Sequence, residues 1–119
     1  MKIRDAMDTN CVCVGLTDTL ATAIMVLGDS EAIPVCSHGR PVGLLTKASL
    51  SEWMERQGPE HTVRKVREAM TVPALVVDSE AEAEMEASRV KEHGANHAVV
   101  MDGEKIVGMF SPDRLARRY

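Results

Sequence analysis

Two hydroxyl residues, Thr46 and Ser111, are the last residues of a short sequence phrase that occurs twice in the chain. The first copy reads VGLLT and the second reads VGMFS, so that a glycine and two apolar residues precede each hydroxyl. Each apolar run predicts a strand, and the residues that follow predict a helix. A hydroxyl at such a junction lies beside the free N–H groups of the helix start. It can therefore cap the helix or help to bind a phosphate, and both interpretations stay open.

Cysteine and histidine supply the other side chains with metal or redox chemistry. Cys11 and Cys13 are expected on one face of a strand, and Cys36 on a strand nearby, with His38 beyond it. Three thiols and an imidazole can bind zinc, but the C-x-C spacing is not a zinc signature. Cysteine is also among the most frequently buried residue types. Buried core cysteines are therefore the favoured interpretation.

No motif identifies an enzyme. The sequence contains no nucleophile elbow, metal-protease helix, P-loop or dinucleotide-binding glycine pattern. Serine, histidine and aspartate are present, but no spacing among them identifies a catalytic triad. We therefore expect a protein without catalytic activity.

Composition and charge exclude several classes of protein. The net charge of −4 gives no general attraction to nucleic acid or anionic membranes. No apolar run approaches membrane-spanning length, and the first residues lack a secretory apolar region. We expect a cytoplasmic protein with neither a membrane nor a nucleic-acid partner. Three cysteines without a signal peptide argue against a disulfide framework.

The two phrases belong to an internal repeat that covers the chain. The segment IRDAM at 3–7 matches VREAM at 66–70, which lies 63 positions later. The strands at 11–14 and 74–77 keep this offset, whereas from the strand residues 33–35 and 98–100 onward the offset is 65, as for Gly43 and Gly108. One length change of two residues in a surface loop explains both offsets, and loops tolerate such changes. A chance similarity would not keep one constant offset, change it once and then keep the second offset to the end.

Each repeat predicts the order β-α-β-β-α over about 60 residues. In the first repeat a strand over 11–14 precedes a helix over 20–27, which Asp18 or Thr19 caps and Gly28 ends. The other predicted elements are strands at 32–36, 40–46, 74–77, 97–101 and 105–110, a helix around 82–92 with Ala83, Ala87 and Val90 on its inner face, helices after Thr46 and Ser111, and a linker around Gly58 and Pro59.

The chain resembles the cystathionine-β-synthase (CBS) domain in three features. These are the segment that begins each repeat (the lead-in, IRDAM at 3–7 and VREAM at 66–70), the Pro-Val strand at 34–35, and the Gly-apolar-apolar-Thr phrase followed by Leu. The resemblance covers essentially the whole chain as a tandem pair. It implies an α+β fold in which repeats 1–58 and 59–119 are related by a pseudo-twofold axis, with their sheets packed together as one cooperative module. It also implies a regulatory module that forms a homodimer, acts on an unknown regulated protein and requires no cofactor. The resemblance further implies clefts between the repeats that bind AMP, ADP, ATP or S-adenosylmethionine as a regulatory ligand.

The chain departs from the family at the ribose contact. The family usually places an Asp three residues after the hydroxyl, whereas Ser49 and Arg114 stand there in this chain. Loss of charge-assisted bonds of about 1.5–3 kcal/mol weakens binding by about tenfold to a hundredfold. We therefore expect weak binding, at most one well-occupied site per chain, and better binding at the Thr46 end. Arg114 either meets an anion or is a solvated surface arginine. The candidate ligand-binding residues are Val12, Val14, Pro34, Thr46, Ser49, Leu75, Val77, His97, Ser111 and Arg114.

Two alternatives to a ligand sensor stay open. One is a purely structural module for homodimerisation or protein interaction. Small residues at Ala23, Ala83 and Ala87 would permit close helix packing, either between two subunits or within one. The other alternative is a metal or redox sensor that uses the cysteines, although no set of metal ligands is assigned.

Overall fold

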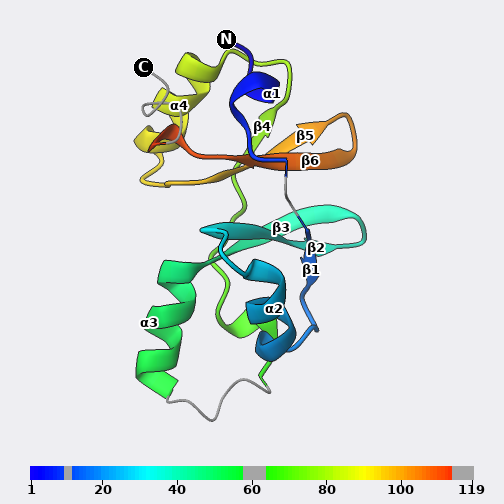
Figure 1. Ribbon diagram of the computed structural model, residues 1–119, viewed down its shortest axis with the longest axis vertical. Helices are drawn as coiled ribbons and strands as arrows, with labels where there is room; N and C mark the ends of the chain where they lie inside the picture. Colours follow the sequence, from blue (N-terminus) through cyan, green and yellow to red (C-terminus); the bar gives the residue numbers. More distant parts are fainter. Residues whose placement is uncertain (10–11, 58–63, 114–119) are drawn as a thin grey trace. The chain divides into compact units, whose positions relative to one another are not determined.

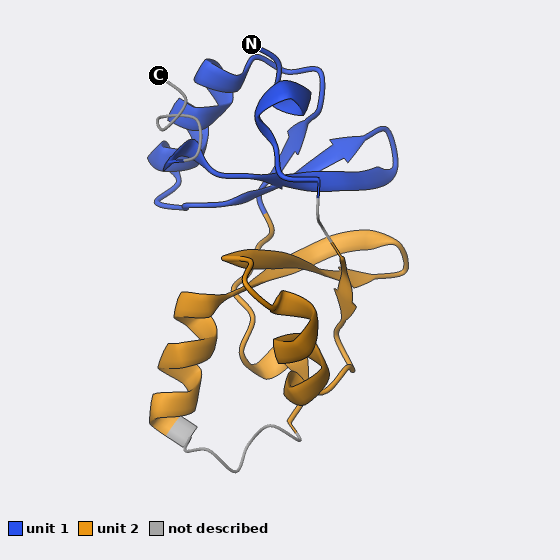
Figure 2. Cartoon of the chain, in the orientation of Figure 1, with its two compact units in different colours: residues 1–11, 75–119 blue, residues 12–74 orange. Residues whose placement is uncertain are grey.

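The computed structural model describes residues 1–9, 12–57 and 64–113, and the chain divides into two compact units (Figure 2). Unit 1 comprises residues 1–11 and 75–119, and unit 2 comprises residues 12–74. Within the described ranges no helix is long and apolar enough to cross a membrane.

Unit 2 contains a three-stranded sheet and the helices that cover it (Figure 1). In the sheet β1 pairs with β2 in parallel, and β2 pairs with β3 in antiparallel orientation. The elements are β1 (Val14–Gly15), α2 (Leu20–Leu27), β2 (Ala32–Ser37), β3 (Arg40–Thr46), α3 (Lys47–Gln57) and the 3-10 turn η2 (Val66–Glu68).

Helix α2 has the bounds and the caps that the sequence predicted. The Thr22 N–H donates to the Thr19 hydroxyl at 3.2 Å, which satisfies one free donor of the first turn. Gly28 ends the helix with φ at +52°, a conformation that disfavours side chains with a Cβ.

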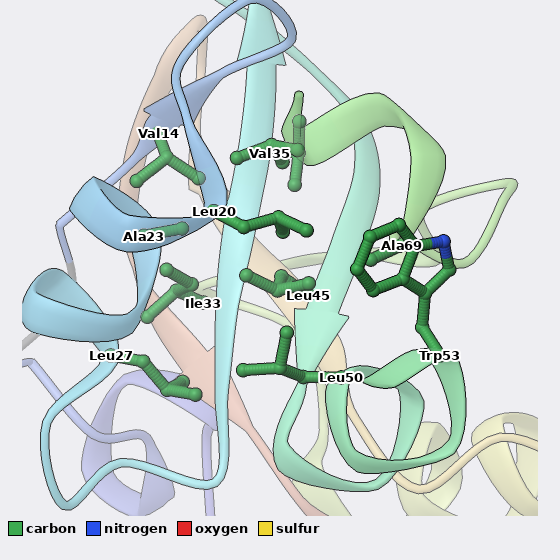
Figure 3. Packing of buried hydrophobic residues seen from close by; sticks show 11 residues of the cluster. Val14, Leu20, Ala23, Leu27, Ile33, Val35, Leu45, Leu50, Trp53 and Ala69 are labelled. Atoms are coloured by element: carbon green, nitrogen blue, oxygen red, sulfur yellow. The ribbon is translucent and has the colours of Figure 1, made fainter. Parts of the chain in front are cut away.

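The core of unit 2 lies between the sheet and its helices (Figure 3). Because aromatic residues form only 3% of the sequence, aliphatic side chains make up most of it, with Trp53 of α3 as the exception. The cluster consists of Val14, Leu20, Ala23, Leu27, Ile33, Val35, Leu45, Leu50, Trp53, Val66 and Ala69.

Unit 1 repeats the same architecture (Figure 1). Its sheet has the order β4-β5-β6, with one parallel and one antiparallel pair. Its elements are α1 (Ile3–Ala6), β4 (Val76–Asp78), α4 (Ala83–Glu92), β5 (Ala98–Asp102) and β6 (Lys105–Phe110). Residues 112–113 begin the predicted last helix, and the rest of that helix lies outside the described residues. The predicted α+β class is therefore confirmed.

Each repeat begins with a lead-in segment, IRDAM at 3–7 or VREAM at 66–70, and this segment packs on the sheet of the other repeat. Ile3 is fully buried in the core of unit 1, and Val66 is fully buried in the core of unit 2. The same backbone bonds hold both: Ile3 N–H donates to Ala81 C=O at 2.9 Å, and Val66 N–H donates to Asp18 C=O at 2.9 Å. The compact units are thus assembled from different segments than the repeats 1–58 and 59–119.

The repeated Val-Gly phrase brings the middle of β3 and β6 against these lead-ins. Leu44 and Thr71 exchange two backbone hydrogen bonds of 3.0 and 2.8 Å, and Met109 and Asp8 exchange two of 3.0 and 2.8 Å. A Cβ on Gly43, the residue before Leu44, would lie 2.7 Å from the Thr71 carbonyl oxygen. The recurrence of glycine therefore has a steric cause, since only glycine permits this backbone approach.

Two predicted strands begin later than the sequence indicated. The strands expected at 11–14 and 74–77 are β1 (Val14–Gly15) and β4 (Val76–Asp78). In unit 1 the Val99 N–H donates to the Leu75 carbonyl at 2.8 Å, at the start of the parallel pairing. The matching residue of unit 2, 65 positions earlier, is Pro34, which has no N–H to donate. Parallel pairing in unit 2 therefore begins only at Val14.

Candidate functional site

The Thr46 hydroxyl lies at the junction of β3 and α3 and takes part in reciprocal capping. The Ser49 N–H donates to Thr46 Oγ1 at 2.9 Å, and the Thr46 N–H donates to Ser49 Oγ at 3.1 Å. The Ser49 hydroxyl also donates to the Thr46 carbonyl at 3.1 Å. This is the geometry of a capping box, so Thr46 does cap the helix. Ser49, at the position where the resemblance expects a carboxylate, is bonded back to the junction.

Other groups at the start of α3 are also engaged within unit 2. The Lys47 N–H donates to the Glu31 carbonyl at 3.0 Å, and Lys47 Nζ donates to the Asp29 carbonyl at 3.3 Å. With Ser49 N–H bound to Thr46, much of the donor capacity of the first turn is used. An anion at this junction would gain the Lys47 charge but would compete with these bonds.

The second hydroxyl, Ser111, is half-buried at the end of β6 and is followed by buried Pro112. Pro112 has no N–H, and the matching Lys47 N–H of the first junction is bonded to the Glu31 carbonyl, so neither junction offers this backbone donor to a ligand. Asp113 is exposed. Arg114, the residue three positions after Ser111, lies outside the described residues.

Three of the apolar candidates belong to the protein interior. Val14 and Val77 are 3% and 2% exposed and lie in the two core clusters, and Pro34 is fully buried. These side chains therefore contribute to the interior of their units, and their contact with a ligand stays a prediction. Successive residues of each short strand point to opposite faces of the sheet, and Val14 and Val77 lie on the face that is covered by the core.

The remaining apolar candidates differ in exposure. Val12 is exposed and Leu75 is half-buried against the core cluster of unit 1. Val76, which the sequence analysis did not single out, is 40% exposed because it precedes the inward-facing Val77. The period-2 alternation of the strand was the signal that could have found it.

Histidine and cysteine are distributed over separate elements. His97 is half-buried just before β5, and exposed His93 has Nδ1 2.8 Å from the Arg89 carbonyl. Cys13 is exposed and Cys36 is half-buried, so the prediction of buried core cysteines is wrong for Cys13. Cys11 lies outside the described residues. Within the described part of the chain no group of three or more His, Cys, Asp or Glu side chains comes together to hold a metal.

Comparisons with known proteins agree with this architecture. The family model for the CBS domain matches residues 3–56. No curated protein matches the chain at a significant level.

Several solved structures share the fold over nearly the whole chain. The structure of Hypoxic Response Protein I with two coordinated zinc ions has a TM-score of 0.80 and 24% identity, and the match covers 100% of this chain and 99% of that one. The CBS domain of a bacterial CNNM/CorC family Mg²⁺ transporter, solved with ATP, has a TM-score of 0.79 and 16% identity, with coverage of 98% and 85%.

A third structure is a CBS domain pair in complex with 5′-methylthioadenosine and S-adenosyl-L-methionine. Its TM-score is 0.83 at 15% identity, and the match covers 99% of this chain and 94% of that one. These likenesses show the fold, and the family model shows the domain in the first half of the chain. The chain therefore contains a CBS domain, which the family model places at residues 3–56, and it has the fold of CBS domain pairs over nearly its whole length.

Proposed function

We propose that the chain is a non-catalytic regulatory module that binds an adenosine-containing ligand weakly. The observation that carries the proposal is the fold shared with a CBS domain pair bound to 5′-methylthioadenosine and S-adenosyl-L-methionine. The Mg²⁺-transporter domain solved with ATP has the same fold and supports the same ligand class. Because one fold can serve several functions, the proposal also has to be argued from the candidate site.

The Thr46 end is the proposed site of contact with the ligand. Its hydroxyl is half-buried at a helix start, and the next residue, Lys47, carries a positive charge whose ammonium group donates to the Asp29 carbonyl. The other predicted contacts are Val12, Val14, Pro34, Ser49, Leu75, Val77, His97, Ser111 and Arg114. Ser111 is the weaker of the two hydroxyls as an anion contact, since it is followed by uncharged Pro112 and Thr46 is followed by Lys47.

Ser49 supplies the physical reason for weak binding. A carboxylate at this position could accept bonds from both ribose hydroxyls, whereas the serine hydroxyl already donates to the Thr46 carbonyl and accepts from the Thr46 N–H. A ribose that bound Ser49 would have to replace these two bonds. The net gain from the contact would therefore be small.

Calorimetric titration of the whole chain with AMP, ADP, ATP and S-adenosylmethionine tests the site. We expect weak binding in the wild type and a gain of about tenfold to a hundredfold for Ser49→Asp, which adds a charge-assisted contact. Ser49→Ala is the matched control, because it removes the serine bonds without adding a carboxylate, and it should not tighten binding. Thr46→Val should weaken binding.

Three results would contradict this proposal in different ways. Submicromolar affinity of the wild type would show that the carboxylate is not needed. Unchanged binding in Thr46→Val would show that the site lies elsewhere. The absence of binding at millimolar ligand would favour a purely structural dimerisation module instead.

We further propose that the module functions as a homodimer that uses faces of α2 and α4. Ala23 and Ala83 cannot form the interface, because both are fully buried in the core clusters. The exposed apolar side chains on these helices are Ile24, Met25 and Met85, and Met25 is 83% exposed.

Sedimentation of the wild type at tens of micromolar, about the range of modest interfaces, should therefore give a dimer. Met25→Lys should shift the equilibrium toward monomer. A wild-type monomer at this concentration would contradict the proposal.

The metal alternative has one observation in its favour, namely the fold shared with a protein solved with two coordinated zinc ions. Within this chain the described residues offer exposed Cys13 but no group of three metal-binding side chains. Native mass spectrometry of freshly purified protein separates the three functions. A bound adenosine compound supports the sensor, stoichiometric zinc supports the metal protein, and a dimer without either supports the structural module.

A further inference from the structure

In unit 1 a single carboxylate binds two cations of the lead-in segment. Lys2 Nζ lies 2.7 Å from Glu80 Oε2, and Arg4 Nη1 lies 3.0 Å from Glu80 Oε1. The pKa of Glu80 is lowered, chiefly because Lys2 donates a hydrogen bond to it and also because Arg4 is charged. Each oxygen of one carboxylate therefore has its own cation.

The matching residues of unit 2 are identified by the backbone as well as by the sequence. Arg4 N–H donates to the Ser79 carbonyl at 2.9 Å, and Arg67 N–H donates to the Leu16 carbonyl at 3.3 Å. In both units, therefore, the backbone of the lead-in Arg is bonded to the residue that precedes Glu80 or its counterpart Thr17. With the offset of 63, Lys65 and Arg67 match Lys2 and Arg4, and Thr17 matches Glu80.

Unit 2 thus keeps both cations but lacks the carboxylate. Lys65, Arg67 and Thr17 are all exposed. Among the described residues, neither the Lys65 nor the Arg67 side chain forms an ion pair.

Two acidic residues next in sequence to these positions, Glu68 and Asp18, are engaged elsewhere. Glu68 accepts a bond from the Lys65 backbone N–H at 3.2 Å and lies 3.7 Å from Arg64. Asp18 accepts from the Gly15 N–H at 2.8 Å. Within residues 12–57 and 64–74, therefore, no carboxylate is recorded on this pair of cations in the position that Glu80 provides in unit 1.

We propose that Lys65 and Arg67 bind a carboxylate side chain of a partner protein, in the place that Glu80 fills in unit 1. Two cations held on one short turn match the two oxygens of one carboxylate, as the Glu80 geometry demonstrates within this chain. The net charge of −4 opposes general binding of polyanions such as nucleic acid. An acidic segment would therefore be attracted by the charges of Lys65 and Arg67 themselves and not by the charge of the whole chain.

Fluorescence anisotropy with a labelled hexaglutamate peptide and the full chain tests the proposal at low ionic strength, where screening is weak. The wild type should bind the peptide. Thr17→Glu should weaken binding about threefold to tenfold, because the new carboxylate occupies both cations as Glu80 does. The double variant Lys65→Ala, Arg67→Ala should weaken it by a similar factor. Thr17→Gln, which has nearly the same size and no charge, should leave it unchanged.

A second variant separates this site from general charge effects. Arg40→Ala removes one exposed positive charge from the first residue of β3 and should leave peptide binding unchanged. Thermal unfolding supplies an independent readout, since Thr17→Glu should raise the Tm relative to Thr17→Gln by forming the internal pair.

The proposal is overturned if the wild type does not bind the peptide at millimolar concentration. It is also overturned if Arg40→Ala weakens binding as much as the double variant, or if Thr17→Glu changes neither binding nor Tm.

Discussion

Gly43→Ala and Gly108→Ala are each expected to lower the free energy of unfolding by about 1–3 kcal/mol, the usual effect of overpacking a close contact. A Cβ at Gly43 would lie 2.7 Å from the Thr71 carbonyl oxygen and 3.0 Å from Met70 Sδ. A Cβ at Gly108 would lie 2.6 Å from the Asp8 carbonyl oxygen. The nearest atom is backbone in both cases, so relief requires the lead-in to move away from the sheet.

Urea denaturation of the two variants measures this effect, and Gly15→Ala is the matched control. Gly15 also lies in a strand, but the nearest atom to its Cβ would be Asp18 Oδ2 at 3.6 Å, an ordinary van der Waals distance. The control should be neutral or stabilising by a few tenths of a kcal/mol, because alanine restricts the unfolded chain. Equal stabilities of Gly43→Ala and Gly15→Ala would show that β3 and residue 71 do not approach so closely.

The sequence predicted the elements well wherever local signals are strong. Thr19, the apolar spacing of α2 and Gly28 together set the bounds of that helix, and the structure has the same bounds. The glycine-bearing turn between residues 37 and 40 separated β2 from β3 correctly. These signals act within a few residues and do not depend on the rest of the fold.

The packing of each lead-in on the sheet of the other repeat, which we call the exchange of the lead-ins, could not be predicted from such local signals. IRDAM and VREAM are nearly the same, so either segment could pack on either sheet as far as local sequence indicates. The repeated glycine was visible, but its cause is a contact between residues 28 positions apart, Gly43 and Thr71. Such contacts depend on chain connectivity and packing, which a repeat pattern does not contain.

The candidate site was predicted only in part for similar reasons. Thr46 was placed correctly at a strand-to-helix junction, and one of its two interpretations, helix capping, is confirmed. The bond from Ser49 back to Thr46 follows from the spacing of three residues, which is the spacing of a capping box and was interpreted only as a missing carboxylate. The burial of Val14 and Val77 in the core could not be predicted, because an apolar strand of two or three residues does not show from sequence which face is buried.

The exchange predicts that two fragments of nearly equal length behave differently. Residues 1–60 contain the first repeat but lack Val66 and Ala69, which belong to the core of unit 2. They also carry Ile3 and Ala6, whose partners lie in the second half of the chain. Residues 12–74 contain every member of the unit 2 cluster.

The energetic difference between these fragments is large relative to the stability of so small a unit. Burial of a valine such as Val66 stabilises by about 1.5–3 kcal/mol. Each backbone bond to the lead-in, such as that from Val66 N–H to Asp18 C=O, adds about 0.5–1.5 kcal/mol. A folded unit of this length has a stability of only about 3–9 kcal/mol, at 0.05–0.15 kcal/mol per residue. Loss of the lead-in is therefore enough to unfold it.

We expect residues 1–60 to be unfolded or aggregated, and residues 12–74 to show more helix by circular dichroism and slower amide exchange. The fragment 12–74 should still be less stable than the whole chain, because we predict that the two repeats form one cooperative module. Val66→Asp in the fragment 12–74 is the control, since it places a charge at a position with no exposed surface. If 1–60 melts cooperatively as a soluble monomer, the shared-core prediction is wrong. If 12–74 has no more structure than its Val66→Asp variant, the lead-in contributes little to the core of unit 2.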